Sequence, residues 1–490
     1  MALPGSFDRL QCHWQGGVAK SSRPPLPNFP QIVRPGVAGR VGEDTINSQH
    51  IAIESKASSC PALRLAEGLE LIGQYQGSGF QEPRYLVRRS DGQIIQLPRL
   101  MYLLAANLDG NRDLVQLADV LSAELDKVVR PDQVAYLVDN RLRPAGIVAA
   151  DPQSAPAGMA PPIVVRSDPL LAFRLRIGVI PERLAWRIAG LFRPMFWPPV
   201  ILAMLAAFVG LDVLIIAQGG LGQIVPSTVA LIYQPTLTLL VMALILASAA
   251  FHECGHVSAC RYGGAKPGVM GFGLYLVWPA FYSTVTDSYR LDRIGRLRTD
   301  LGGVYFNAVF ISGMDLAYLN NRTPWLLVAI VALHLETATQ FLPMIRLDGY
   351  YILADLIGVP DLFSRLGPVL ASLIPGRPTH PRVRELKPWV RRTITLWVLI
   401  VVPSILYWVI GFVIVAPQVL PVLWHQLIWL FQAVSTAAAT GQLAVAALGA
   451  VNILLLVLPC VGSLLLLGMI VRDPVRWVLA RRGRAQLQNG

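Results

Sequence analysis

The stretch ASAAFHECGHVSAC (247–260) closes the uncharged run Gln218–Phe251 and decides how the whole chain is interpreted. Residues four apart share one face of a helix, so His252 and His256 can hold one metal ion between them. Glu253 follows the first histidine and can reach a water molecule on that metal. Two core histidines that hydrogen-bond along a helix are the alternative. Because such groups are costly in an apolar span, the pattern predicts a functional zinc site.

The third ligand of this site has to come from elsewhere in the chain, because a catalytic zinc ion needs three protein ligands and one open position. The best candidate is Asp348 in MIRLDGYYILADL (344–356), an acid with mostly apolar neighbours at the end of an apolar span. Gly349 beside it permits close approach of the backbone. An acid that merely ends a span is the alternative from sequence alone.

Other ionisable residues lie on the same apolar stretches. His334 and Glu336 are two apart and point to different helix faces, so we expect support of the site or a polar contact across the bundle rather than a rival ligand pair. Asp355 follows Asp348 by two helical turns on the same face. It either orients a ligand or substrate, or makes a contact between helices.

Two further acids, Asp212 and Asp315, stand alone in or near apolar spans. We expect them to mark cavity edges or span ends. The five cysteines are scattered and form neither a metal quartet nor a disulfide framework. Cys254 lies inside the histidine motif and is interpreted as a small core residue.

Composition indicates a membrane protein. Hydrophobic residues make up 54% of the 490 residues and charged residues 15%, whereas soluble chains carry about 25% charged residues. The formal net charge of +12 does not indicate nucleic-acid binding, because the basic residues cluster beside apolar spans. We therefore expect a polytopic α-helical membrane protein with about six transmembrane helices, preceded by a soluble α+β domain of winged-helix type.

The apolar spans can be placed approximately. They are expected at 196–217, in the latter part of 218–251, at 301–319, at 324–345, and as two or three spans within 393–471. Clusters of arginine and lysine separate the spans in a pattern that puts both termini in the cytosol of a bacterial cell. The segment VMGFGLYLVWPAFYSTVT (269–286) is apolar but short and contains Pro279. It is interpreted as a re-entrant or interfacial β-like segment.

The rest of the chain divides by composition. Residues 1–60 are rich in Pro, Gly, Ser and Arg and are expected to be disordered, without a cleavable signal peptide. Residues 61–150 are expected to form the soluble domain, 151–180 a Pro-rich linker, and 181–490 the membrane domain.

The predicted soluble domain combines a hairpin with short helices. YLVRRSDGQIIQL (85–97) reads as two strands joined by a turn, and helical periodicity follows at 97–108, 115–125 and 131–142. Leu69–Ala149 resembles PqqD-like domains, which bind leader segments of ribosomally made peptides. The resemblance is carried by the Asp91-Gly92 turn, the Leu108-Asp109-Gly110 turn and the closing Arg141–Gly146 stretch. A regulatory or structural cytosolic domain is the alternative.

The site motifs carry a second resemblance. The sequence His252–His256, followed by Leu347-Asp348-Gly349, resembles the site-2 protease family of intramembrane zinc peptidases. This implies that Asp348 completes the metal site. The family also has a G-P-x-x-N segment. Gly303–Asn307 keeps its Gly and Asn without the Pro, which implies a substrate-binding role for Asn307. The amino-acid sequence around these motifs is most similar to that of the bacterial peptide zinc metalloproteases.

These patterns lead to an expected function. Zn²⁺ held by the two histidines and Asp348, with water activated by Glu253, would hydrolyse a small ribosomally made peptide or a membrane-anchored protein. The expected partners are that substrate, the lipid bilayer and a peptide exporter, with no nucleic acid. The alternative is a non-enzymatic zinc-containing membrane protein in peptide export, sensing or immunity, against which the intact Glu253 argues.

Overall fold

The computed structural model describes residues 6–7, 63–149, 175–275, 278–458 and 460–462. The chain divides into a smaller unit of residues 11–74 and 83–165, and a larger unit of residues 1–10, 75–82 and 166–490. Except for Ser6–Phe7, the predicted disordered tail lies outside the described residues. The same holds for most of the predicted linker and for the basic C-terminal cluster.

The smaller unit is a three-stranded antiparallel sheet with three helices. Its elements are β2 (Glu70–Gln74), β3 (Arg84–Arg88), β4 (Ile94–Pro98), α2 (Arg99–Ala106), α3 (Leu114–Leu125), α4 (Pro131–Leu137) and a π-helical turn (Val138–Leu142). The strand order is β2-β3-β4. A capping box between Asp113 and Gln116 begins α3, as expected for the orphan N–H groups of a helix N-terminus. The predicted hairpin and the three predicted helical stretches are confirmed.

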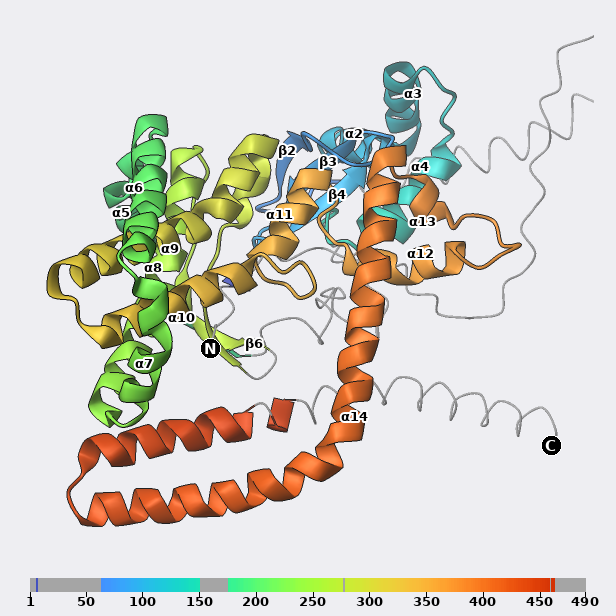
Figure 1. Cartoon of the computed structure of the whole chain (residues 1–490). Coiled ribbons are helices and arrows are strands. Elements are labelled where there is room, and N and C mark those ends of the chain that lie inside the picture. The colour runs from blue at the N-terminus through green and yellow to red at the C-terminus, as the bar shows by residue number, and fades with distance from the viewer. Residues whose placement is uncertain (1–5, 8–62, 150–174, 276–277, 459, 463–490) are drawn as a thin grey trace, which may run out of the picture. The chain divides into compact units, whose positions relative to one another are not determined.

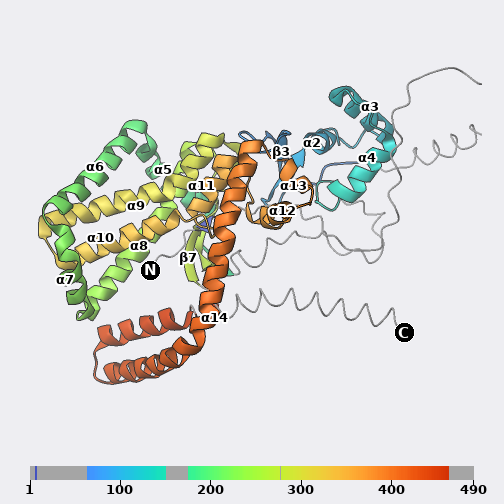
Figure 2. The ribbon, with the colours of Figure 1, turned by 45° about the vertical axis from the view of Figure 1, so that its right-hand side comes forward.

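The larger unit is mainly helical. Its principal helices are α5 (Glu182–Leu191), α6 (Pro198–Ala217), α7 (Gly220–Ile232), α8 (Pro235–Tyr262), α9 (Arg293–Asn321), α10 (Pro324–Gln340), α11 (Asp348–Ile357), α12 (Leu366–Ser372), α13 (Pro381–Arg384) and α14 (Pro388–Ala439). Helices α8, α9 and α10 lie side by side in both ribbon views (Figures 1 and 2). Short 3₁₀ turns occupy Arg193–Phe196, Thr286–Arg290 and Phe363–Arg365.

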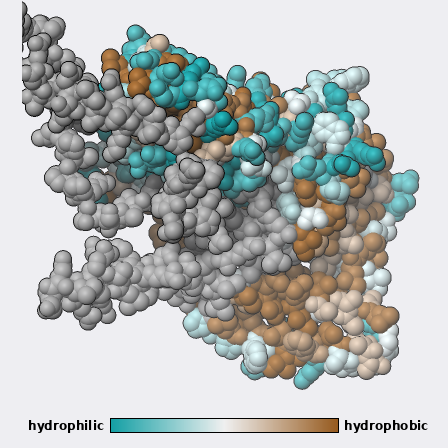
Figure 3. Space-filling view, turned by 180° about the vertical axis from the view of Figure 1, so that it is seen from behind, coloured by the Kyte–Doolittle hydropathy of each residue, from teal (hydrophilic) through white to brown (hydrophobic). Residues whose placement is uncertain are grey.

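Five helices among the described residues are long and apolar enough to cross a membrane: Pro198–Ala217, Pro235–Tyr262, Pro388–Gly411, Pro417–Ala439 and Leu443–Gly462. Hydrophobic side chains accordingly cover much of the lower part of the face in Figure 3. The predicted third and fourth spans fall on α9 and α10, which are not among the five. The total of six spans therefore stays a prediction. Residues 426–440, which sequence left undecided, fall mostly within the Pro417–Ala439 helix.

A four-stranded sheet completes the larger unit, in the order β1-β7-β6-β5. Its strands are β1 (Ser6–Phe7), β5 (Leu175–Ile180), β6 (Met270–Tyr275) and β7 (Trp278–Ser283). Strands β6 and β7 pair antiparallel from Met270 opposite Ser283 to Tyr275 opposite Trp278. The β character expected for 269–286 is thus confirmed, whereas its re-entrant position in a membrane stays a prediction.

Glycines bring α8 and α9 into close contact. A Cβ atom at Gly302 would lie 2.7 Å from the carbonyl oxygen of Gly255, and a Cβ atom at Gly255 would overlap the carbonyl of Gly302. Small residues at a helix crossing let the two backbones approach closely, as in membrane helix pairs generally. This contact sets the distance between the histidine motif on α8 and the side chains of α9.

Candidate metal centre

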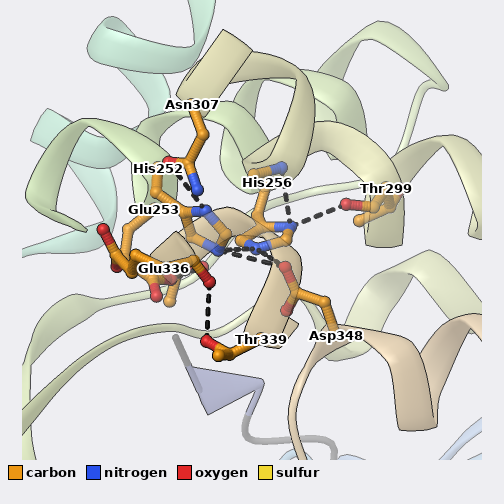
Figure 4. Close-up of polar contacts among 10 residues, drawn as sticks. His252, Glu253, His256, Thr299, Asn307, Glu336, Thr339 and Asp348 are labelled. Carbon is orange, nitrogen blue, oxygen red and sulfur yellow. Dashed lines mark hydrogen bonds and ion pairs between the residues drawn. The ribbon is translucent and has the colours of Figure 1, made fainter. Parts of the chain in front are cut away.

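Three buried side chains from two helices converge on one point. His252 and His256 come from the C-terminal half of α8, and Asp348 is the first residue of α11. The Nε2 atoms of the two histidines are 3.0 Å apart, and Oδ2 of Asp348 lies 3.1 Å from the first and 3.5 Å from the second. Figure 4 shows the carboxylate facing both imidazoles. The structure therefore brings together the three ligands predicted from sequence.

The hydrogen bonds behind the imidazoles fix their tautomers. Nδ1 of His256 lies 2.8 Å from the carbonyl oxygen of Thr299, and Nδ1 of His252 lies 3.2 Å from Oδ1 of Asn307. Both oxygens only accept, so each Nδ1 carries a proton and each Nε2 is left with a lone pair. The amide N–H of Gly303 also lies 3.3 Å from Nδ1 of His256. The contact with the Thr299 carbonyl is 0.5 Å shorter, which favours the proton on Nδ1.

The donor set fits a zinc ion. Two Nε2 lone pairs and a carboxylate face one another, and a cation bound between these three donors stabilises them together. Neither Asp348 oxygen has a hydrogen-bond partner among the described residues. Tetrahedral ligands about 2.0–2.2 Å from zinc lie about 3.3 Å from each other, close to the three separations found. Within the described part of the chain, this is the one group of His, Cys, Asp or Glu with metal-binding spacing.

The environment of Asp348 keeps it ionised, as a metal ligand must be. Burial raises the pKa of this carboxyl, but the interactions with the neighbouring His256 and His252 outweigh burial and lower the pKa to about 2. A metal cation between the imidazoles would act in the same direction. The neighbouring Gly349 has no room for a side chain, because a Cβ atom there would overlap the backbone of Phe341. The expected close backbone approach at this glycine is confirmed.

Glu253 lies beside the ligands and is held by a residue that sequence reasoning missed. Oγ of Ser283, at the end of β7, donates to Oε2 of Glu253 over 2.7 Å. The second oxygen, Oε1, is buried and has no partner among the described residues. One oxygen is therefore fixed by the protein while the other is left for a water molecule. The only sequence signal for Ser283 was its place in the predicted β-like segment.

Helix α9 supplies one face to the site. Thr299, Gly303 and Asn307 are spaced by four residues, so they stand above one another along that face. A Cβ atom at Gly303 would overlap Nε2 of both His252 and His256. The predicted substrate-binding residue Asn307 bonds His252, and its Nδ2 atom has no partner among the described residues. Its role toward substrate stays a prediction.

The remaining candidates separate as follows. The carboxylate of Glu336 interacts electrostatically with His252 and Asp348, and it lies at the edge of the site in Figure 4. His334 instead bonds Asp212 across the bundle. The expectation that His334 and Glu336 point to different faces of their helix, with a polar contact across the bundle, is therefore confirmed.

The acid Asp315 lies within α9 and is fully buried, which does not fit the expected cavity edge or span end.

Asp355 makes the contact between helices that sequence left open. Its Oδ1 lies 3.4 Å from Nε of Arg296 on α9, and both side chains are buried. The same guanidinium donates to the carbonyl of Gln76 over 2.9 Å and lies 4.4 Å from the centre of the Tyr75 ring. Arg296 therefore ties α11, and with it the Asp348 end of the site, to α9.

Comparisons with known proteins give one partial relative. A segment of 118 residues is 30% identical to the "Putative peptide zinc metalloprotease protein YydH" of Bacillus subtilis (strain 168). The match covers 23% of this chain and 46% of that protein, so the chain spans less than half the length of the relative. No family model matches the chain, and no solved structure does. The comparison supports a zinc metalloprotease family and nothing finer.

Proposed function

We propose that this chain is a membrane-embedded zinc metalloprotease of the site-2 type. The observation that carries the proposal is the arrangement around Glu253. Three buried donor atoms converge beside a carboxylate whose one oxygen is held by Ser283 and whose other oxygen has no partner in the described part of the chain. A site that only bound a metal would have no use for a carboxylate oriented in this way.

Different residues of the site have different roles in the proposed peptide hydrolysis. His252, His256 and Asp348 would hold Zn²⁺, which supplies Lewis acidity and lowers the pKa of water toward about 7. Oε1 of Glu253 accepts the proton from the attacking water and passes it to the departing amine. Nδ2 of Asn307 has no acceptor among the residues that the structure describes, and in this account it hydrogen-bonds the substrate backbone.

The substrate we propose is a small ribosomally made peptide or a membrane-anchored protein. The relative is named as a peptide metalloprotease, and the five apolar helices fit a site reached from the bilayer or its surface. In this account the smaller unit presents the substrate in the manner of PqqD-like domains. Both termini lie in the cytosol of a bacterial cell.

The experiment that tests this function is capture of the substrate. Glu253→Gln protein, expressed in its natural host, should retain a peptide that wild-type protein does not, because it binds without cutting. The exposed Glu182→Gln on α5 of the larger unit is a matched control. The captured peptide, identified by mass spectrometry, should be cut by wild-type protein with zinc. Equal retention by all three proteins with no cleavage would favour the non-enzymatic alternative in export, sensing or immunity.

A further inference from the structure

A second group of ionisable side chains lies away from the metal centre, on three apolar helices. Asp212 is the one charged residue of α6, Asp315 is the one charged residue in the second half of α9, and His334 lies on α10. Ionisable groups are rare in apolar helices of membrane proteins, where they mark ion or proton sites. The metal centre uses none of these three residues.

The hydrogen bonds of His334 indicate how many protons its imidazole ring carries. Its Nδ1 lies 2.9 Å from the carbonyl oxygen of Ile330, which only accepts, so Nδ1 carries a proton. Its Nε2 lies 3.1 Å from Oδ2 of Asp212, and this contact needs one shared proton. With that proton the pair is neutral overall, either as imidazolium and carboxylate or as imidazole and acid. The ring of Phe208 stacks on His334 with 5.5 Å between centres.

Because the pair of Asp212 and His334 is neutral, the net charge of the three residues depends on whether Asp315 is protonated. It is 0% exposed, and neither of its oxygens has a hydrogen-bond partner among the described residues. Its electrostatic interactions are with Asp212 and His334. The apolar side chains of Ile311, Tyr318 and Ile330 form the core next to it. A bare carboxylate in such surroundings costs several kcal/mol or more, and buried acids avoid that cost by taking up a proton.

The other charged groups of the surrounding helices do not neutralise Asp315. Helix α7 carries none. Glu336 of α10 interacts with the metal centre, as do the ionisable residues of the motif on α8. The charges of α11 are Asp348 and Asp355, which contact the histidines and Arg296. The other charged residues of α9, including Asp300, lie in its first three turns or at its C-terminal cap. Arg261 lies in the last turn of α8.

We propose that Asp212, Asp315 and His334 form a proton-binding site inside the helical unit, in which Asp315 is held as a carboxylic acid. The partly exposed pair of Asp212 and His334, with side chains 25% and 36% exposed, exchanges the proton with the surroundings. Binding adds one proton to one carboxylate oxygen, without any electron transfer. Asp212, Asp315 and His334 are not spaced as metal ligands among the described residues. We therefore expect the cation that binds this site to be a proton and not a metal ion.

This site is separate from the metal centre. Asp315 follows Asn307 by eight residues on α9, which is about 12 Å along a helix axis. Its charge can therefore change without altering the zinc ligands. An acid that is protonated when folded and ionised when unfolded loses its contribution to stability as pH rises. Asp315 should accordingly make the thermal stability of the wild type fall as pH rises from mildly acidic toward neutral values, and its contribution should level off above neutral pH.

Infrared difference spectroscopy of the purified full-length protein tests the proposal. The wild type at neutral pH should show a carboxylic-acid C=O band that Asp315→Asn loses and Asp212→Asn keeps at a shifted position. Unchanged zinc content shows that each variant is folded. Identical carboxylic-acid bands in the wild type and Asp315→Asn would overturn the proposal.

Two measurements on the wild type keep the test independent of the variants. With ¹³C in the aspartate side chains, the carboxylic-acid band should move, and absence of any aspartic-acid band would overturn the proposal. Melting temperature at fixed pH should not respond to Na⁺ replacing a large organic cation at constant ionic strength. A stabilisation by Na⁺ that disappears in Asp315→Asn would show that a metal cation, and not a proton, occupies the site.

Discussion

Ser283 donates a hydrogen bond to Glu253 over 2.7 Å, from the end of strand β7 to the C-terminal half of helix α8. The bond joins the small sheet of the larger unit to the base beside the metal ligands. Because it occupies Oε2, it leaves Oε1, which has no partner among the described residues, for the water of the proposed reaction. The β6–β7 hairpin is therefore part of the proposed catalytic machinery and not only a covering of the helices.

Ser283→Ala should lower kcat while leaving the zinc content unchanged. A hydrogen bond to a charged group contributes about 1.5–3 kcal/mol, so we expect about a tenfold to a hundredfold loss. The control is Ser288→Ala, a buried serine nearby whose hydroxyl has no partner among the described residues. Equal kcat values for the two variants would remove Ser283 from the mechanism.

Gly303→Ala should abolish zinc binding, because the added methyl group overlaps Nε2 of both histidines. The control is Gly313→Ala on the same helix, where a Cβ atom meets nothing within 4 Å. That change should retain zinc and stabilise the helix by about 0.5–1 kcal/mol. Metal analysis of the two purified variants decides the matter, and full zinc occupancy in Gly303→Ala would mean that the ligands are placed differently.

Asn307→Ala should weaken zinc binding, because it removes the acceptor that fixes the tautomer of His252. Loss of such a contact behind a metal ligand reduces affinity by about 10–100-fold. The control, Asn320→Ala, changes an exposed residue of the same helix. A competition titration with a chelator measures both. If zinc affinity stays at the wild-type value and only KM rises, Asn307 acts on substrate alone.

Asp355→Ala should destabilise the larger unit, because it leaves the buried Arg296 without its carboxylate. Breaking one side of a buried ion pair costs about 3–5 kcal/mol. Glu70→Gln removes the partner of Arg88 in a partly exposed pair and should cost no more than about 1 kcal/mol. Thermal unfolding in detergent compares the two. Similar melting temperatures would show that the contact with Arg296 does not hold α11.

Local patterns made part of this site predictable from sequence. The spacing of His252 and His256 follows from helix periodicity, and apolar neighbours marked Asp348 as unusual. The bond from Ser283 could not be predicted, because strand pairing decides which residue of 269–286 meets α8. Likewise, the contact of Asn307 with His252 depends on the close packing of Gly255 against Gly302, which no single helix reveals.

The fold was predictable to a similar extent. The hairpin at 85–97 and the helices after it follow from alternation and helical spacing. The two or three spans expected within 393–471 agree with three apolar helices among the described residues, Pro388–Gly411, Pro417–Ala439 and Leu443–Gly462. The first two belong to the 52-residue helix α14, which continues through Pro403, Pro417 and Pro421. Prolines in an apolar helix do not necessarily end it, because neighbouring groups can satisfy the freed carbonyls. The pairing of Asp212 with His334 joins residues of α6 and α10 and has no local signal.

Metal content measured together with cleavage of the captured peptide tests the central claim most directly. Purified wild type and Glu253→Gln should each carry one zinc ion per chain, and only the wild type should cut. Asp348→Ala should carry no zinc and cut nothing, because two imidazoles alone leave the ligand set incomplete. Full zinc occupancy in Asp348→Ala, or wild-type cleavage by Glu253→Gln, would contradict the account.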